Sequence, residues 1–92
     1  MKNIKETKKI EKNFSVAESE GVDAINLIYE MEFNNAKDDK SAMKDLYEVL
    51  DRKMWAHNKN KDLFETYKSL HQKTKEWVIE NYRFCELEDF FA

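Results

Sequence analysis

The stretch SAMKDLYEVLDRKMWAHNKNKDLFETYKSLHQKTKEWV, residues 41–78, decides the fold of this chain. On both sides of Asn58-Lys59-Asn60, apolar residues recur at alternating spacings of three and four, which is the pattern of a buried stripe on an α-helix. The two stripes are Met43, Leu46, Tyr47, Leu50, Met54 and His57, then Leu63, Phe64, Tyr67, Leu70, His71, Thr74, Val78, Tyr82 and Cys85. Matched stripes joined by so short a segment predict an antiparallel helical hairpin over residues 40–57 and 61–85.

The residues around the break predict where these helices begin and end. Asn58 is suited to the left-handed conformation that often follows a helix. An antiparallel hairpin centred near residue 59 places Tyr47 beside His71, where the two side chains are expected to form a hydrogen bond. The candidate N-caps are Asp38, Asp39 or Ser41 for the first helix and Asn60 for the second.

The residues before the hairpin predict one further helix, over about 16–35. Ser15 with Glu18 matches the S-x-x-E capping box, and Ser19 offers a later start. Apart from Met1, residues 1–14 hold only three apolar side chains among five lysines, so they are expected to be a basic arm that is flexible or ordered by a partner. The core stripe of the predicted helix is Val22, Ile25, Ile28, Tyr29, Phe33 and Ala36.

Composition favours the same fold class. The chain has 92 residues, no proline and one glycine, with 41% hydrophobic and 38% charged residues, so turn signals are scarce. We expect one all-α domain over 15–92, a small three-helix antiparallel bundle with a basic N-terminal arm and an acidic, aromatic C-terminal tail. A chain this short buries only roughly 60 to 65% of its unfolded surface, so its monomer is expected to be marginally stable. Association, most simply as a homodimer, is therefore expected.

The same composition bears on location. No run approaches the roughly 18 apolar residues of a membrane span, and no apolar run follows the lysine-rich start, so a cytoplasmic protein is expected. A single cysteine, Cys85, excludes an internal disulfide and is expected to be a small buried residue. Fourteen lysines against two arginines indicate AT-rich coding, as in phages and low-GC bacteria.

No pattern of residues indicates catalysis, a metal or a cofactor. His71 and Cys85 share a stripe but lie about 21 Å apart along a helix axis, and no zinc or di-metal motif occurs. His57 is expected to stabilise a helix C-terminus. No serine lies beside a histidine, and Gly21 stands alone, without a glycine-rich phosphate loop. We expect neither enzyme activity nor a small-molecule substrate.

Large apolar residues away from the stripes are the most informative feature. Such side chains are typical anchors of protein interfaces. The alternatives for what covers them are a second copy of the chain, a foreign protein, or the arm and tail folded back on the monomer. The leading hypothesis is a non-enzymatic protein-interaction module, a small regulator or inhibitor of the antitoxin, immunity or phage host-directed type. The candidate interface residues are Leu27, Met31, Trp55, Phe84, Leu87, Phe90 and Phe91.

The alternative is a nucleic-acid-associated regulator that contacts phosphates through lysines. One group of lysines lies in the arm, and the other repeats every seven residues along the last helix. The acidic net charge of −3, the scarcity of arginine, and the nearby Glu65, Glu76 and Glu80 count against it. The candidate residues are Lys8, Lys9, Lys12, Lys61, Lys68 and Lys75.

Overall fold

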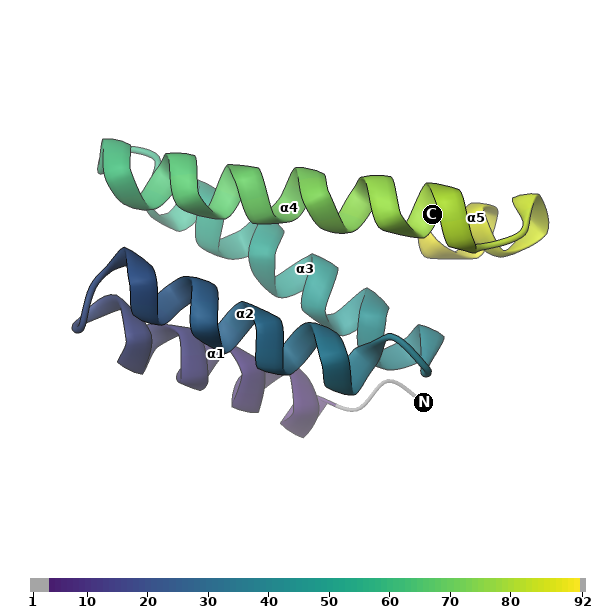
Figure 1. Ribbon diagram of the computed structural model, residues 1–92, viewed down its shortest axis with the longest axis horizontal. Helices are drawn as coiled ribbons and strands as arrows, with labels where there is room; N and C mark the ends of the chain where they lie inside the picture. The colour runs from purple at the N-terminus through teal and green to yellow at the C-terminus, as the bar shows by residue number, and fades with distance from the viewer. Residues whose placement is uncertain (1–3, 92) are drawn as a thin grey trace.

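Two helical hairpins pack against each other, and a short fifth helix closes one end (Figure 1). The computed structural model describes residues 4–91, with side chains from Thr7 onward. These residues form five helices and no strand, so the all-α class is confirmed, but the described part of the chain has five helices where three were predicted. The helices are α1 (Ile4–Glu18), α2 (Val22–Ala36), α3 (Lys40–Ala56), α4 (Lys61–Asn81) and α5 (Phe84–Phe90).

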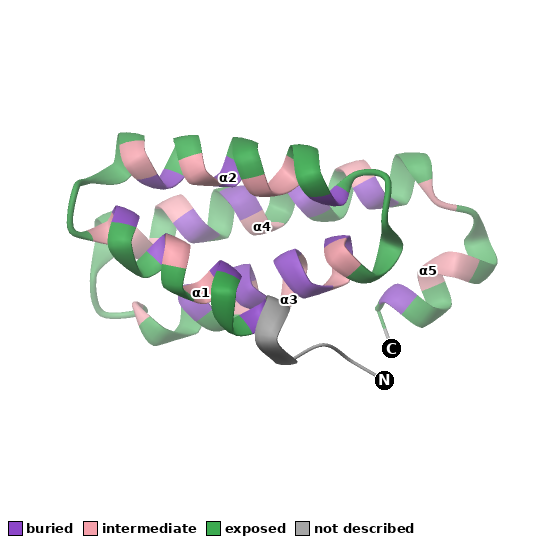
Figure 2. Cartoon of the chain, turned by 90° about the horizontal axis from the view of Figure 1, so that it is seen from below, coloured by how far each residue is buried: buried purple, intermediate pink, exposed green. Residues whose placement is uncertain are grey.

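The central helix is α3, which packs against α1, α2 and α4. Its predicted stripe, including the fully buried Leu46 and Leu50, faces the core. The buried surface of α3 is wider than that stripe, because Asp45, Val49 and Lys53 are buried as well. Helix α1 covers this second side of α3, which accounts for the extra burial (Figure 2).

Local sequence sets the ends of the α3–α4 hairpin. The Oδ1 of Asp39 accepts hydrogen bonds from the backbone N–H of Ser41 and Ala42 at 3.0 and 3.3 Å, and the Oδ1 of Asn60 accepts one from Leu63 at 3.3 Å. Both caps are among those predicted. The left-handed conformation predicted for Asn58 is wrong, because no described residue other than glycine has a positive φ.

The basic arm predicted over residues 1–14 differs most from the structure. From Ile4 the chain is helical, and Ile10, Phe14 and Ala17 are buried in the core. Residues 1–3 lie outside the described part. The Phe14 ring meets the Tyr67 ring edge-on, with centroids 5.8 Å apart. Three apolar residues spaced by four and three are a sparse stripe, but burial against α2 and α3, together with the contact of Phe14 with Tyr67 of α4, is enough to hold it.

The helix predicted over 16–35 is also wrong at its start, because the break falls at residues 19–21. Gly21 precedes α2 with a φ of 119°, a conformation that side-chain-bearing residues rarely adopt. Ser15 and Glu18 therefore lie inside α1 and form no capping box, and Ser19 does not cap α2.

Helix α4 ends at Asn81, four residues before the end of the helix predicted over 61–85. Tyr82 and Arg83 are extended, with ψ of 152° and 157°, and the chain then turns into α5. This break takes Cys85 off the stripe of α4. The thiol is exposed, so the expectation of a buried cysteine is wrong.

Candidate functional site

The outer side of α2 presents two large apolar side chains to solvent. Leu27 and Met31, one turn apart, are 60% and 56% exposed. Asp23 and Glu30 share this side, since at 100° per residue all four lie within an arc of about 100°. The buried residues Ile25, Tyr29 and Ala36 lie opposite. We call Asp23, Leu27, Glu30 and Met31 the α2 ridge.

A hollow flanks the α2 ridge on each side. One, of about 580 Å³, lies between α1, α2 and the start of α3, and Met31 lines it together with Ile10 and Asn13. The other, of about 210 Å³, lies between α2 and α4, and Glu30 lines it together with Trp77. A partner lying along the ridge would therefore find space for side chains on both sides.

The C-terminal tail is divided between core and surface. Phe90 is only 6% exposed, with its ring against those of Tyr47 and Tyr82 at 5.3 and 5.7 Å. Leu87 is half-buried against the same core. Both are therefore parts of the monomer core and not free anchors, which corrects the expectation for these two residues. Phe84 is 79% exposed and Phe91 is 38% exposed.

The fold-back has a clear cause. The extended Tyr82–Arg83 segment reverses the chain, and the backbone N–H of Arg83 donates to Glu86 at 2.8 Å. Lys40 then forms an ion pair with Glu86, and Lys44 donates to the backbone carbonyl of Asp89 at 3.0 Å. Helix α5 is thus fixed against the start of α3.

Trp55 lies on a different surface, at the closed end of the α3–α4 hairpin. It is 60% exposed, and its ring meets the half-buried Phe64 ring at a centroid distance of 6.4 Å. Because it lies on α3, the structure does not bring it together with Leu27 and Met31 on the α2 ridge.

The two groups of candidate lysines lie on different helices. Lys8, Lys9 and Lys12 are on α1, whereas Lys61, Lys68 and Lys75 are on α4. Figure 1 shows these helices on opposite sides of the molecule. All six side chains are exposed, and Lys9 lines the 580 Å³ hollow beside α2. The structure therefore does not join the two groups into one basic surface.

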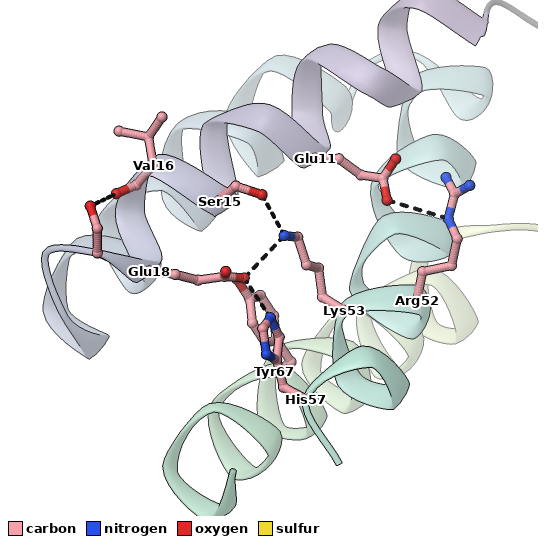
Figure 3. Close-up of polar contacts among 9 residues, drawn as sticks. Glu11, Ser15, Val16, Glu18, Arg52, Lys53, His57 and Tyr67 are labelled. Atoms are coloured by element: carbon pink, nitrogen blue, oxygen red, sulfur yellow. Dashed lines mark hydrogen bonds and ion pairs between the residues drawn. The ribbon is translucent and has the colours of Figure 1, made fainter. Parts of the chain in front are cut away.

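A polar cluster that the sequence analysis missed joins α1 to the α3–α4 hairpin (Figure 3). The Oε2 atom of Glu18 accepts a hydrogen bond from the Tyr67 hydroxyl at 2.5 Å and lies 3.1 Å from both Lys53 Nζ and His57 Nε2. Lys53 also donates to the Ser15 hydroxyl at 2.6 Å. We call these five residues the Glu18 cluster.

The electrostatics of this cluster follow from its donors. Burial alone would raise the pKa of Glu18, but hydrogen bonds from Tyr67 and Lys53, with the charges of Lys53 and His57, outweigh it and lower that pKa. Burial and the neighbouring Glu18 carboxylate strongly raise the pKa of the Tyr67 hydroxyl. The carboxylate is thus a charged acceptor, and the phenol a neutral donor.

The Glu18 cluster has the groups of a serine–lysine pair but not the arrangement that such chemistry needs. The Lys53 ammonium donates to both Glu18 and Ser15, so it offers no free base. Ser15 lies within α1, where backbone N–H groups bond to the preceding turn, so no oxyanion donors surround it. The cluster instead links helix α1 to helices α3 and α4. The one sequence feature that could have pointed to it is the spacing of Ile10, Phe14 and Ala17, which indicates that Ser15 and Glu18 lie on a helix.

The two histidines are held by different contacts. His57 is the C-cap residue of α3 and its Nε2 lies 3.1 Å from Glu18. The hairpin register correctly places His71 beside Tyr47, and the two rings stack with their centroids 4.3 Å apart. The expected hydrogen bond between them is replaced by an approach of His71 Nε2 to Asp51 at 3.7 Å. Burial lowers the pKa of His71, Asp51 acts in the opposite direction, and Lys75 adds to the lowering.

Among the described residues, no three His, Cys, Asp or Glu side chains gather as metal ligands. None of the helices in residues 4–91 combines the length and apolar character that crossing a membrane requires. No protein family, curated protein or solved structure matches this chain.

Proposed function

We propose that this protein is a non-enzymatic helical module that binds another protein through the α2 ridge, as a small regulator or inhibitor. The observation that carries the proposal is the exposure of Leu27 and Met31, one turn apart, beside the 580 Å³ hollow. Large apolar side chains next to a hollow are typical of interface anchors. Antitoxins, immunity proteins and phage proteins directed at host proteins are the classes of regulator we have in mind.

The charge of the ridge indicates the kind of partner surface it fits. The ridge itself carries Asp23 and Glu30, and α2 holds no basic residue, whereas Lys9 and Lys73 line the flanking hollows. An apolar partner surface with a basic rim would complement it and would speed association. Aromatic contacts of Tyr29 with Phe33 and of Phe33 with Trp77, with ring centroids 5.7 and 5.1 Å apart, support α2 on the side away from the ridge.

The test compares two double variants. Leu27→Ala with Met31→Ala removes the apolar groups of the ridge, and Val16→Ala with Ile79→Ala removes similarly exposed groups on α1 and α4. Full burial of such a side chain contributes about 1.5 to 3 kcal/mol. Because these side chains are already partly covered, we expect about 2 to 3 kcal/mol for the pair, or roughly 30- to 150-fold in Kd.

The measurement uses a protein captured from extract of the source cell and then purified. Its Kd is determined by calorimetry for each variant, with circular dichroism confirming that the variants fold. Sedimentation equilibrium tests a second copy as the partner, since a wild-type dimer that the ridge variant converts to monomer identifies it. Equal affinities for the two double variants would refute the proposal.

A further inference from the structure

A second surface, on another side of the molecule, combines aromatic rings with basic side chains. It lies along the outer groove between α3 and α4, and we call Tyr47, Trp55, Phe64 and His71 the hairpin seam. Tyr47 stacks on His71 and Trp55 meets Phe64 edge-on. Lys53, which reaches α1, is two residues from Trp55 and thus points about 160° away from it around the helix. The Trp55 end of the seam therefore faces away from α1, whereas Arg52, at the α3 edge of the seam, lies 3.8 Å from Glu11 of α1.

Basic side chains border this seam along α4. Lys61, Lys68 and Lys75 repeat every seven residues, so they follow one side of the helix at intervals of about 10 Å. The Lys68 ammonium lies 5.8 Å from the centre of the Phe64 ring, and Lys75 is close enough to His71 to influence it electrostatically. Glu65 and Glu76, with Lys68, line a separate hollow on α4.

On the α3 side the seam contains a hollow of about 400 Å³. It is lined by the stacked rings of Tyr47 and His71 and by Arg52, Asp51 and Glu48. Arg52 and the three lysines give this face four basic side chains, against the carboxylates of Glu48 and Asp51 and that of Glu11, which pairs with Arg52 from α1, in a chain whose net charge is −3. The seam is therefore basic although the chain as a whole is acidic.

These features favour one class of ligand. Lysines beside accessible rings are the combination that holds single-stranded nucleic acid, in which phosphates pair with cations and bases stack on aromatic faces. In the seam the ring of Trp55 is exposed, and those of Tyr47, Phe64 and His71 are half-buried. The carboxylates of this hollow would repel phosphates and acidic side chains alike. A nucleobase resting against Tyr47 and His71, however, brings amino groups that can donate to Asp51, whereas an acidic side chain has no such donor.

We propose that the hairpin seam binds single-stranded nucleic acid, with Trp55 and the Tyr47–His71 hollow receiving bases and Lys61, Lys68 and Lys75 contacting phosphates. This proposal is independent of the α2 ridge, which uses other residues on another helix. Bound strand and bound protein partner would contact different parts of the surface.

The probes are fluorescein-labelled 12-nucleotide single strands of mixed sequence, one DNA and one RNA, whose anisotropy is followed on addition of the full-length protein in 50 mM salt. We expect a Kd of about 1 to 100 µM, which weakens as salt rises. The triple variant Lys61→Gln, Lys68→Gln, Lys75→Gln should bind at least 10-fold more weakly. Its salt dependence should fall by a slope of about 2, since each phosphate contact on a single strand contributes about 0.7. Tighter binding of one strand identifies the natural ligand.

A second readout reports stacking directly. The chain has two tryptophans, so Trp77→Phe leaves Trp55 as the fluorescent ring. Its emission should be quenched by the strands and unaffected by inorganic polyphosphate, which has no bases. Trp55→Ala should weaken strand binding about 10-fold, and because this side chain is largely exposed the variant should keep its thermal midpoint.

The matched control is Lys8→Gln, Lys12→Gln, Lys37→Gln, which removes equal charge from exposed positions off the seam. It should bind nearly as the wild type does. Three results would overturn the proposal: no anisotropy change up to about 100 µM protein, equal weakening in the control, or equal binding of a 12-residue polyglutamate. The last would show that the seam holds any polyanion, an acidic polypeptide included.

Discussion

Replacing Phe14 by alanine tests whether the N-terminal helix is part of the core. Phe14 is fully buried and packs edge-on against Tyr67. Removing it loses about 1.5 to 3 kcal/mol of apolar burial and an aromatic contact of about 0.5 to 1.5 kcal/mol, and leaves a cavity. Alanine is the better helix former, which returns about 0.5 kcal/mol. We expect a net loss of about 3 to 4 kcal/mol in the free energy of unfolding.

The assay is urea denaturation at pH 7 followed by circular dichroism, with a thermal scan beside it. For a domain of this size each kcal/mol lowers the midpoint by about 4 to 8 °C, so a fall of at least 12 °C is expected. Val16→Ala, two residues along the same helix but 54% exposed, is the control and should change stability by less than about 0.5 kcal/mol. A loss below about 1 kcal/mol for Phe14→Ala would refute the reasoning and restore residues 4–14 as an arm outside the core.

Three further outcomes follow from the structure. Glu18→Gln should destabilise the chain at pH 7 but much less at pH 3, as measured by urea titrations at both pH values. The pKa of Glu18 is lower in the folded state than in the unfolded state. Its contribution to stability is therefore present above the ordinary glutamate pKa and disappears as the pH falls through the lowered pKa. Phe90→Ala should cost about 3 to 5 kcal/mol in urea denaturation, whereas the exposed Phe84→Ala should cost less than about 0.5, and equal costs would contradict the packing of α5. Cys85 should react with a thiol reagent in the native state about as fast as in urea, and strong protection would show that the thiol is covered.

What the sequence by itself determined is the part of the structure that local rules govern. The matched stripes of residues 43–57 and 63–78 predicted the α3–α4 hairpin and the position of Tyr47 beside His71, because helical periodicity and a short connection leave one register. The stacking of the two rings, in place of the expected hydrogen bond, was not predicted. The caps at Asp39 and Asn60 were predictable for the same reason, since a cap bonds within three residues of itself. The exposure of Leu27 and Met31 also followed from periodicity.

Only the tertiary structure decided which segments the core would accept. Residues 4–14 carry too few apolar side chains to indicate a core helix, and the burial of Ile10 and Phe14 depends on how α2 and α3 pack against them, with Tyr67 of α4 meeting Phe14. Phe90 is buried because the extended Tyr82–Arg83 segment reverses the chain, which no stripe announces. The Glu18 cluster joins residues 35 to 49 positions apart. Such contacts depend on how whole helices pack, and the information for that packing is spread over the entire core and is not held in any one segment.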